Sequence, residues 1–189
     1  MDSLTHHLRI FRELADWSPA TADYVRRHQI PMRDFVGFAG NIAVLPATIS
    51  GGSFELATDG EASACFEVIG DDGETTVDLC AMSVADPARF GVAVGAATLL
   101  GECNVTNPGS WAFGRHLKVH RTPLTWLKAG GDGVAILDHM FAPVLLGQAL
   151  GPIEAEDSAH ALDLRNMLCR APVNPKNIIF KTHPFRSAA

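Results

Sequence analysis

The stretch CNVTNPGSWAFGRHLKVHRTPLTWLKAGGDGVAILD, residues 103–138, is the most informative part of the sequence for the fold. No acidic residue occurs between Glu102 and Asp132, although the protein has a formal net charge of -6. Basic, imidazole and indole side chains gather there: Arg115, His116, Lys118, His120, Arg121, Trp111 and Trp126. This local excess of cations and rings predicts a surface that binds an anion.

The conformation of this stretch follows from its prolines. Pro123 disfavours a helical backbone at Thr122, so we expect residues 116–121 to be extended. Side chains alternate along a strand, and Leu117 and Val119 would then point to one side while Lys118 and the two neighbouring histidines point to the other. A competing interpretation is that these charges protect a sheet edge against pairing and that the tryptophans belong to the core.

Length and composition predict one domain over residues 1–189. The chain is 47% hydrophobic and 19% charged, and its size suffices for one substantial core. Its longest candidate for membrane insertion, residues 90–100, is about half the length that a spanning helix needs. The N-terminus has no apolar centre typical of a signal peptide, and the four cysteines form no C-x-x-C pair. We therefore expect a cytoplasmic protein with reduced thiols and no membrane contact.

The N-terminal 30 residues predict a helical pair. Leu4, Leu8 and Phe11 recur at helical spacing after Ser3, and Ser18 followed by Pro19 predicts the start of a second helix that runs to about His28. We expect the two helices to pack against each other in antiparallel fashion. At the other end of the chain, residues 181–189 are expected to form a loose tail.

A β-hairpin is the clearest strand signal. Its arms are residues 64–69 and 75–82, joined by a turn that contains Asp72-Gly73. Glu67 and Asp78 alternate with apolar residues in these arms, and we expect both carboxylates to be exposed.

The other expected elements complete an α+β or α/β fold with a mixed sheet and helices packed on it. Asp86-Pro87 predicts a central core helix over residues 86–101. Further strands are expected at residues 35–38, 42–45, 53–57, 133–137 and 177–180. Further helices are expected at residues 123–129, 143–150 and 154–170.

The histidine spacing in the basic stretch does not predict a metal site. His116 and His120 have the spacing of a helical zinc pair, but on a strand they are about 13 Å apart, at about 3.3 Å per residue. Zinc needs ligand nitrogens at about 2 Å. Signatures of a serine or cysteine nucleophile and of a phosphate-binding loop are absent from the sequence.

Asp138 is the best isolated catalytic candidate. It follows an apolar strand-like run, and α/β sheets place ligand-binding groups at the carboxyl ends of their strands. With Asp78 and a histidine such as His139, it would suit a metal-assisted hydrolase or phosphodiesterase. A helix cap before His139 is the competing interpretation.

Three functional hypotheses therefore stay open. The first is a binding protein for a phosphate-bearing small molecule or nucleic acid, with Arg115, Lys118 and Arg121 as anion ligands. The second is the hydrolase based on Asp78 and Asp138. The third is a non-catalytic structural or interaction subunit, and assembly with copies of itself into a homo-oligomer is one such role. The sequence identifies no cofactor and does not decide whether the protein is an enzyme.

Overall fold

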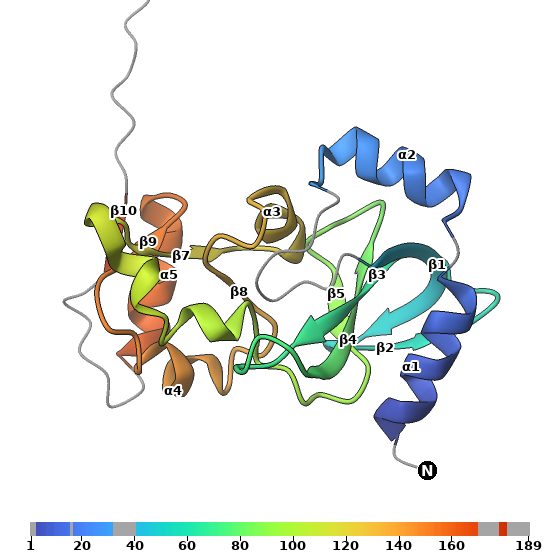
Figure 1. Cartoon of the computed structure of the whole chain (residues 1–189), viewed down its shortest axis with the longest axis horizontal. Helices are drawn as coiled ribbons and strands as arrows, with labels where there is room; N and C mark the ends of the chain where they lie inside the picture. The colour runs from blue at the N-terminus through green and yellow to red at the C-terminus, as the bar shows by residue number, and fades with distance from the viewer. Residues whose placement is uncertain (1–2, 16, 32–40, 170–177, 181–189) are drawn as a thin grey trace, which may run out of the picture.

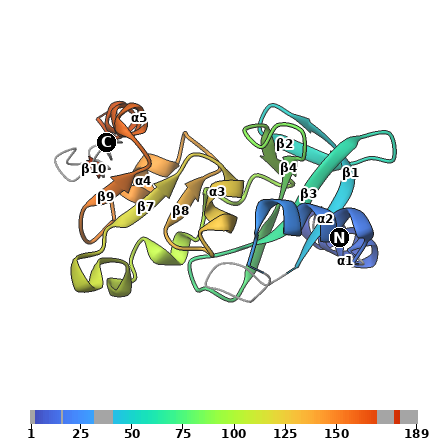
Figure 2. The same cartoon turned by 90° about the horizontal axis from the view of Figure 1, so that it is seen from above.

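A computed structural model describes residues 3–15, 17–31, 41–169 and 178–180. Two β-sheets lie side by side, one in each half of the chain (Figures 1 and 2). The first sheet closes into a small barrel with the strand order β1-β2-β5-β4-β3. Its strands are β1 (Ile42–Ser50), β2 (Ser53–Leu56), β3 (Glu61–Ile69), β4 (Thr76–Ser83) and β5 (Phe90–Val92).

The second sheet is mixed and has the order β10-β9-β7-β8-β6. Its strands are β6 (Leu99–Leu100), β7 (Leu117–His120), β8 (Val134–Ile136), β9 (Ile153–Ala155) and β10 (Ile178–Phe180). The strands β7, β8, β9 and β10 are parallel, and β6 pairs antiparallel with β8.

Five α-helices accompany the sheets in the described ranges. They are α1 (Ser3–Leu14), α2 (Pro19–His28), α3 (Pro123–Lys128), α4 (Ala142–Leu146) and α5 (Ser158–Leu168). Two short 3-10 helices, η1 (Glu102–Asn104) and η2 (Pro108–Gly114), precede β7. The predicted mixture of helices and a mixed sheet is confirmed, although one sheet is a closed barrel. None of the described helices is long and apolar enough to cross a bilayer.

Local signals placed several elements correctly. The Ser18 side chain accepts a hydrogen bond from the Thr21 N–H and caps α2, and Thr122 caps α3 in the same way through the Thr125 N–H. The hairpin of β3 and β4 is present with Cys65 opposite Ala81. The strand expected at residues 35–38 and the tail at 181–189 lie outside the described residues.

The central helix expected over residues 86–101 is wrong. This segment instead forms β5, a loop and β6. Gly91 lies against the barrel, where a Cβ atom would meet the Ser53 backbone at 2.6 Å, and Gly95 has a φ of +73°. The backbone N–H groups of Ala93, Val94, Ala96 and Ala97 bond to a carboxylate instead of to helical carbonyls.

That carboxylate is Asp78, which corrects the expectation that the hairpin acids are exposed. Asp78 is fully buried, and the exposed fraction of Glu67 is 3%. Glu67 accepts hydrogen bonds from Arg12 Nε and NH2, each at 2.9 Å, and one from the Thr76 hydroxyl. Neither acid could be recognised as buried from alternation, because both faces of the hairpin are covered.

Two other expectations need correction. Glu154 belongs to β9, and the helix expected at residues 154–170 begins only at Ser158, after Asp157 caps it by accepting the His160 N–H. The N-terminal helices are present, but each packs on the barrel instead of on the other. Phe11 of α1 and Tyr24 of α2 join separate hydrophobic clusters.

The two halves of the molecule share a core. Phe66 and Val68 of the barrel pack in one cluster with Trp126 and Leu127 of α3 and with Leu100 of β6. Side chains of β8 point alternately to the two faces of the second sheet. Ala135 joins this shared cluster, whereas its neighbours Val134 and Ile136 join a cluster with α4 and α5. The helices α3 and α5 therefore cover opposite faces.

This arrangement creates a topological switch point. The strands β7 and β9 are parallel neighbours, but the chain leaves β7 for α3 on one face and leaves β9 for α5 on the other. In open α/β sheets the crevice outside such carboxyl ends is where ligands bind. Arg121 and Glu156 are the first residues after these two strands.

Candidate functional site

The basic stretch forms the strand that its sequence predicts. Leu117 and Val119 enter the cluster with α4 and α5, and Lys118 and His120 alternate with them. Their strand β7 lies between β8 and β9, so it is an inner strand and the interpretation as a protected sheet edge is wrong.

Every cation of the stretch named above lies beside a carboxylate. Asp132 accepts hydrogen bonds from Arg115 and, at 2.6 Å, from Lys118 Nζ. His116 Nδ1 lies 3.7 Å from Glu154, and His120 Nδ1 lies 3.6 Å from Glu156. Arg121 contacts Glu156, Asp157 and Asp163. The carboxylates outnumber the permanent cations in these pairs, so the strand is not the positively charged surface that its own sequence indicates.

The ion pairs with Arg115 and Lys118 stabilise the charged form of Asp132. Burial raises the pKa of Asp132, but the hydrogen bond and charge of Lys118 and the charge of Arg115 together hold it below its ordinary value. These two cations are thus engaged in linking β7 to the loop before β8. A phosphate ligand would have to displace Asp132 to reach them.

The two tryptophans are not free stacking platforms. Trp126 is fully buried and donates its indole N–H to the Gly133 carbonyl at 3.0 Å. Trp111 donates to the Pro152 carbonyl at 3.1 Å, and its ring lies where a side chain at Gly151 would have to be.

The hydrolase candidates occupy different environments. Both oxygens of Asp78 accept backbone N–H groups, five in all, and the side chain has no solvent access. Asp78 therefore holds a loop and is unavailable to activate water. Asp138 is half-buried, and its Oδ1 accepts the Met140 N–H at 2.7 Å in the turn before α4. The interpretation of Asp138 as a helix cap is wrong, because the N-cap of α4 is Phe141. Among the described residues, no group of three or more His, Cys, Asp or Glu side chains is arranged to hold a metal ion.

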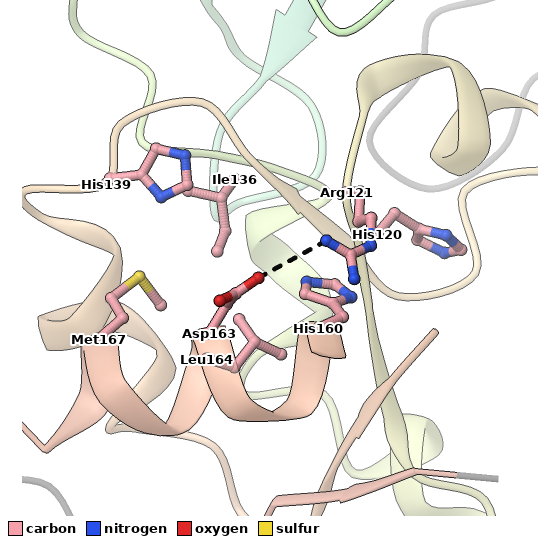
Figure 3. A pocket seen from close by; sticks show the side chains of 8 residues that line it. All are labelled: His120, Arg121, Ile136, His139, His160, Asp163, Leu164 and Met167. Atoms are coloured by element: carbon pink, nitrogen blue, oxygen red, sulfur yellow. Dashed lines mark ion pairs between the residues drawn. The ribbon is translucent and has the colours of Figure 1, made fainter. Parts of the chain in front are cut away.

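A pocket lies at the carboxyl ends of β7 and β8, beside α5 (Figure 3). Its volume is about 160 Å³. We call it the histidine pocket; it is lined by His120, Arg121, Ile136, His139, His160, Asp163, Leu164 and Met167. Apolar side chains from β8 and α5 form one part of its wall, and three imidazoles and an ion pair form the other.

Arg121 is the central polar group of the histidine pocket. Its NH2 atom lies 2.8 Å from Asp157, whereas NH1 is 3.6 Å from Asp163 and Nε is 3.7 Å from Glu156. Figure 3 shows Arg121 and Asp163 facing each other, with His160 beside them and His139 across the pocket. The Asp163 side chain is 69% exposed, so it is the partner most easily replaced.

The hydrogen bonds show which ring nitrogen carries a proton in two of these histidines. His160 Nδ1 accepts the Glu156 N–H at 3.3 Å, so the proton of a neutral ring is on Nε2. His120 Nε2 lies 2.8 Å from the Asp132 carbonyl, which can only accept, so this nitrogen donates. Burial and the charge of Arg121 lower the pKa of His160, although Glu156, Asp157 and Asp163 oppose the shift. The neutral form of the His160 ring is therefore favoured.

The sequence predicts part of this pocket. His120, Arg121 and His139 are candidates from their own segments, whereas His160 and Asp163 are not, because a single helix expected over residues 154–170 leaves no strand end beside them. The signal that could have found them is the change at residues 153–157, where an apolar strand pattern ends in an acidic cap. That pattern places the next helical turn at the carboxyl end of a strand.

No protein-family model, curated protein or solved structure matches this chain.

Proposed function

We propose that the protein binds a small organic carboxylate in the histidine pocket. The observation that carries this proposal is the loose contact between Arg121 and the exposed Asp163 at the switch point of the second sheet. A guanidinium group matches the planar geometry of a carboxylate. Asp163 occupies the position beside Arg121 that a ligand carboxylate would take.

Charge favours a monoanion over a phosphate. Exchange of Asp163 for a ligand carboxylate leaves the charge around Arg121 unchanged, provided that Asp163 turns to solvent. A phosphate dianion would add charge next to Glu156 and Asp157, which already contact the same guanidinium. Like charges at such short range are unfavourable.

Size and polarity define the rest of the ligand. The volume of about 160 Å³ is close to that of a cavity of ~150 Å³ known to accept benzene. Ile136, Leu164 and Met167 supply an apolar wall for a short hydrocarbon group. His160 lines the pocket, and its neutral ring, protonated on Nε2, would offer a hydrogen-bond donor without adding charge.

Isobutyrate tests this proposal against two alternatives. Calorimetry or NMR titration should detect isobutyrate, whereas isobutyramide and inorganic phosphate should bind at least tenfold more weakly. Arg121→Gln should weaken isobutyrate binding about tenfold or more, since hydrogen bonds to charged groups contribute about 1.5–3 kcal/mol. Asp163→Asn should strengthen it, because the competing carboxylate is removed.

Arg26→Gln is the matched control, since Arg26 is another surface arginine paired with an aspartate. It should leave isobutyrate binding unchanged. Tighter binding of phosphate than of isobutyrate would restore the hypothesis of a phosphate-bearing ligand. Weaker binding of isobutyrate to Asp163→Asn would contradict the exchange mechanism.

A further inference from the structure

A second, larger hollow lies between the barrel and the second sheet. Its volume is about 440 Å³. The β1–β2 turn at residues 51–53 and the segment that follows β5 form its barrel side, and Leu137, Asp138 and His139 form its other side. We call it the junction hollow. It is built from both halves of the molecule, which share a core, so its two sides are held together.

The barrel wall of the junction hollow is held by Asp78. The N–H groups of Ala93 and Val94 bond to Oδ1 at 3.0 Å, and those of Ala96 and Ala97 bond to Oδ2 at 2.7 and 3.2 Å. In a trans peptide unit the C=O bond points opposite to the N–H bond. Because these N–H groups converge on Asp78, the carbonyl oxygens of the same peptide units point away from it. Residues 93–95 and 97 of this segment line the hollow, so we assign these outward carbonyl oxygens to its wall as hydrogen-bond acceptors.

Side chains in the wall add further acceptors. Ser53 donates its hydroxyl proton to the Ser50 carbonyl at 2.9 Å, which leaves the Ser53 oxygen as an acceptor. Asp138 uses Oδ1 for the Met140 N–H, and no donor among the described residues reaches its Oδ2. Val92, Val94 and Leu137 supply apolar surface between these groups.

From this acceptor-rich wall we infer that the junction hollow binds an organic ammonium ion. A primary ammonium group has three donors and no acceptor, which complements carbonyl oxygens, a hydroxyl oxygen and one carboxylate. The Asp138 charge favours a cation, and the net charge of the protein, -6, acts in the same direction. The apolar side chains fit the hydrocarbon part. This site is distinct from Arg121 and does not rest on the proposed carboxylate site.

Benzylammonium and its neutral analogue benzyl alcohol test the inference. In NMR titrations of the full chain, benzylammonium should shift the backbone amides of Gly52, Gly95 and His139. Benzyl alcohol should bind at least tenfold more weakly. Asp138→Asn should reduce benzylammonium affinity at least tenfold and leave that of benzyl alcohol unchanged, because the asparagine oxygen can still accept the Met140 N–H.

Asp86→Asn is the matched control. Asp86 Oδ1 also accepts the N–H two residues onward, at 3.2 Å from Ala88, but it lies outside the hollow. This variant should bind benzylammonium like the wild type. Equal affinity for the amine and the alcohol, or no loss in Asp138→Asn, would overturn the inference. NMR shifts confined to His160 and Asp163 would also overturn the inference, because benzylammonium would then bind in the histidine pocket. Failure of isobutyrate to bind would not affect the inference.

Discussion

The pairing of Arg12 with Glu67 shows how one contact makes a buried acid tolerable. The Arg12 side chain is 59% exposed, whereas that of Glu67 is 4% exposed. Burial raises the pKa of Glu67, but hydrogen bonds from Arg12 and Thr76 and the charge of Arg12 lower it below its ordinary value. An uncompensated carboxylate at this position would be costly.

We therefore expect Arg12→Ala to lower the free energy of unfolding by ~1–3 kcal/mol at pH 7, less than for a fully buried pair because Arg12 is largely exposed. The Glu67 contribution is present above its unfolded pKa of about 4.5. It is lost as the pH falls through the lower folded value, so the effect of the variant should shrink in acid. Urea unfolding at several pH values measures this. Arg9→Ala, at an exposed pair with Glu13, should change stability by less than ~0.5 kcal/mol.

His160 makes a second residue-scale prediction. Its folded pKa lies below the ordinary 6.5, first because it is buried and then because of Arg121. The unfolded chain then binds the proton more readily, so stability is lost as the pH falls from about 6.5 through the folded pKa. NMR titration of the His160 ring should give a midpoint below 6.5. Arg121→Gln should move the midpoint upward but not fully to 6.5, and a wild-type midpoint above 6.5 would contradict the assignment.

At the scale of elements, the sequence predicts best where a local signal decides. Thr122-Pro123 fixes both the end of β7 and the start of α3, and the Asp72-Gly73 turn fixes the β3–β4 hairpin. These signals act over a few residues. The loop over residues 93–97 depends instead on Asp78, about 15 residues upstream, which takes the N–H groups that a helix would have used. Spacing within the segment does not reveal that partner.

The candidate site was only partly predictable for the same reason. The alternation of Lys118 and His120 with apolar residues can be read from the sequence of β7 alone. Their carboxylate partners lie in other segments: Glu156 follows β9, and Asp132 precedes β8. Parallel pairing of β7 with β9 brings Lys118 opposite Glu154 and turns an apparent cationic strand into a set of ion pairs. A basic stretch therefore predicts a basic surface only when the neighbouring strands are known.

The Asp78 anchor gives a prediction for the loop. Asp78→Asn replaces one acceptor oxygen by an NH2 group that would face N–H donors. We expect a loss of about 3 kcal/mol in unfolding free energy and faster hydrogen exchange at Ala96 and Ala97. Asp72→Asn is the control, since Asp72 also accepts backbone N–H groups but lies in an exposed turn. If both variants had equal effects, burial of the carboxylate would not be the cause.

On the scale of the whole molecule, the shared core links the two sheets. Leu127 of α3 is fully buried in the same cluster as Phe66 of the barrel. The number of domains remains a prediction, and this cluster favours unfolding as one unit. Burial raises the pKa of Cys65 in the barrel to about 12, so its thiol should react only after unfolding.

We expect the loss of Trp126 burial, followed by fluorescence, and the exposure of Cys65, followed by thiol labelling and peptide mass spectrometry, to occur at the same denaturant concentration. Leu127→Ala should shift both midpoints together, with a loss of about 2–5 kcal/mol. Leu162→Ala is the control, because Leu162 is 58% exposed, and should change neither midpoint appreciably. Separate midpoints would show that the barrel and the second sheet are independent domains.

His139 lines both the histidine pocket and the junction hollow. A ligand in the histidine pocket and a ligand in the junction hollow would therefore contact the same imidazole. A proton on that ring would attract an anion in the pocket and repel a cation in the hollow. If both proposed sites bind their ligands, occupancy of one should change the affinity of the other, and the two effects must be equal in free energy. His139, which lies in both linings, would thus couple binding in one space to binding in the other.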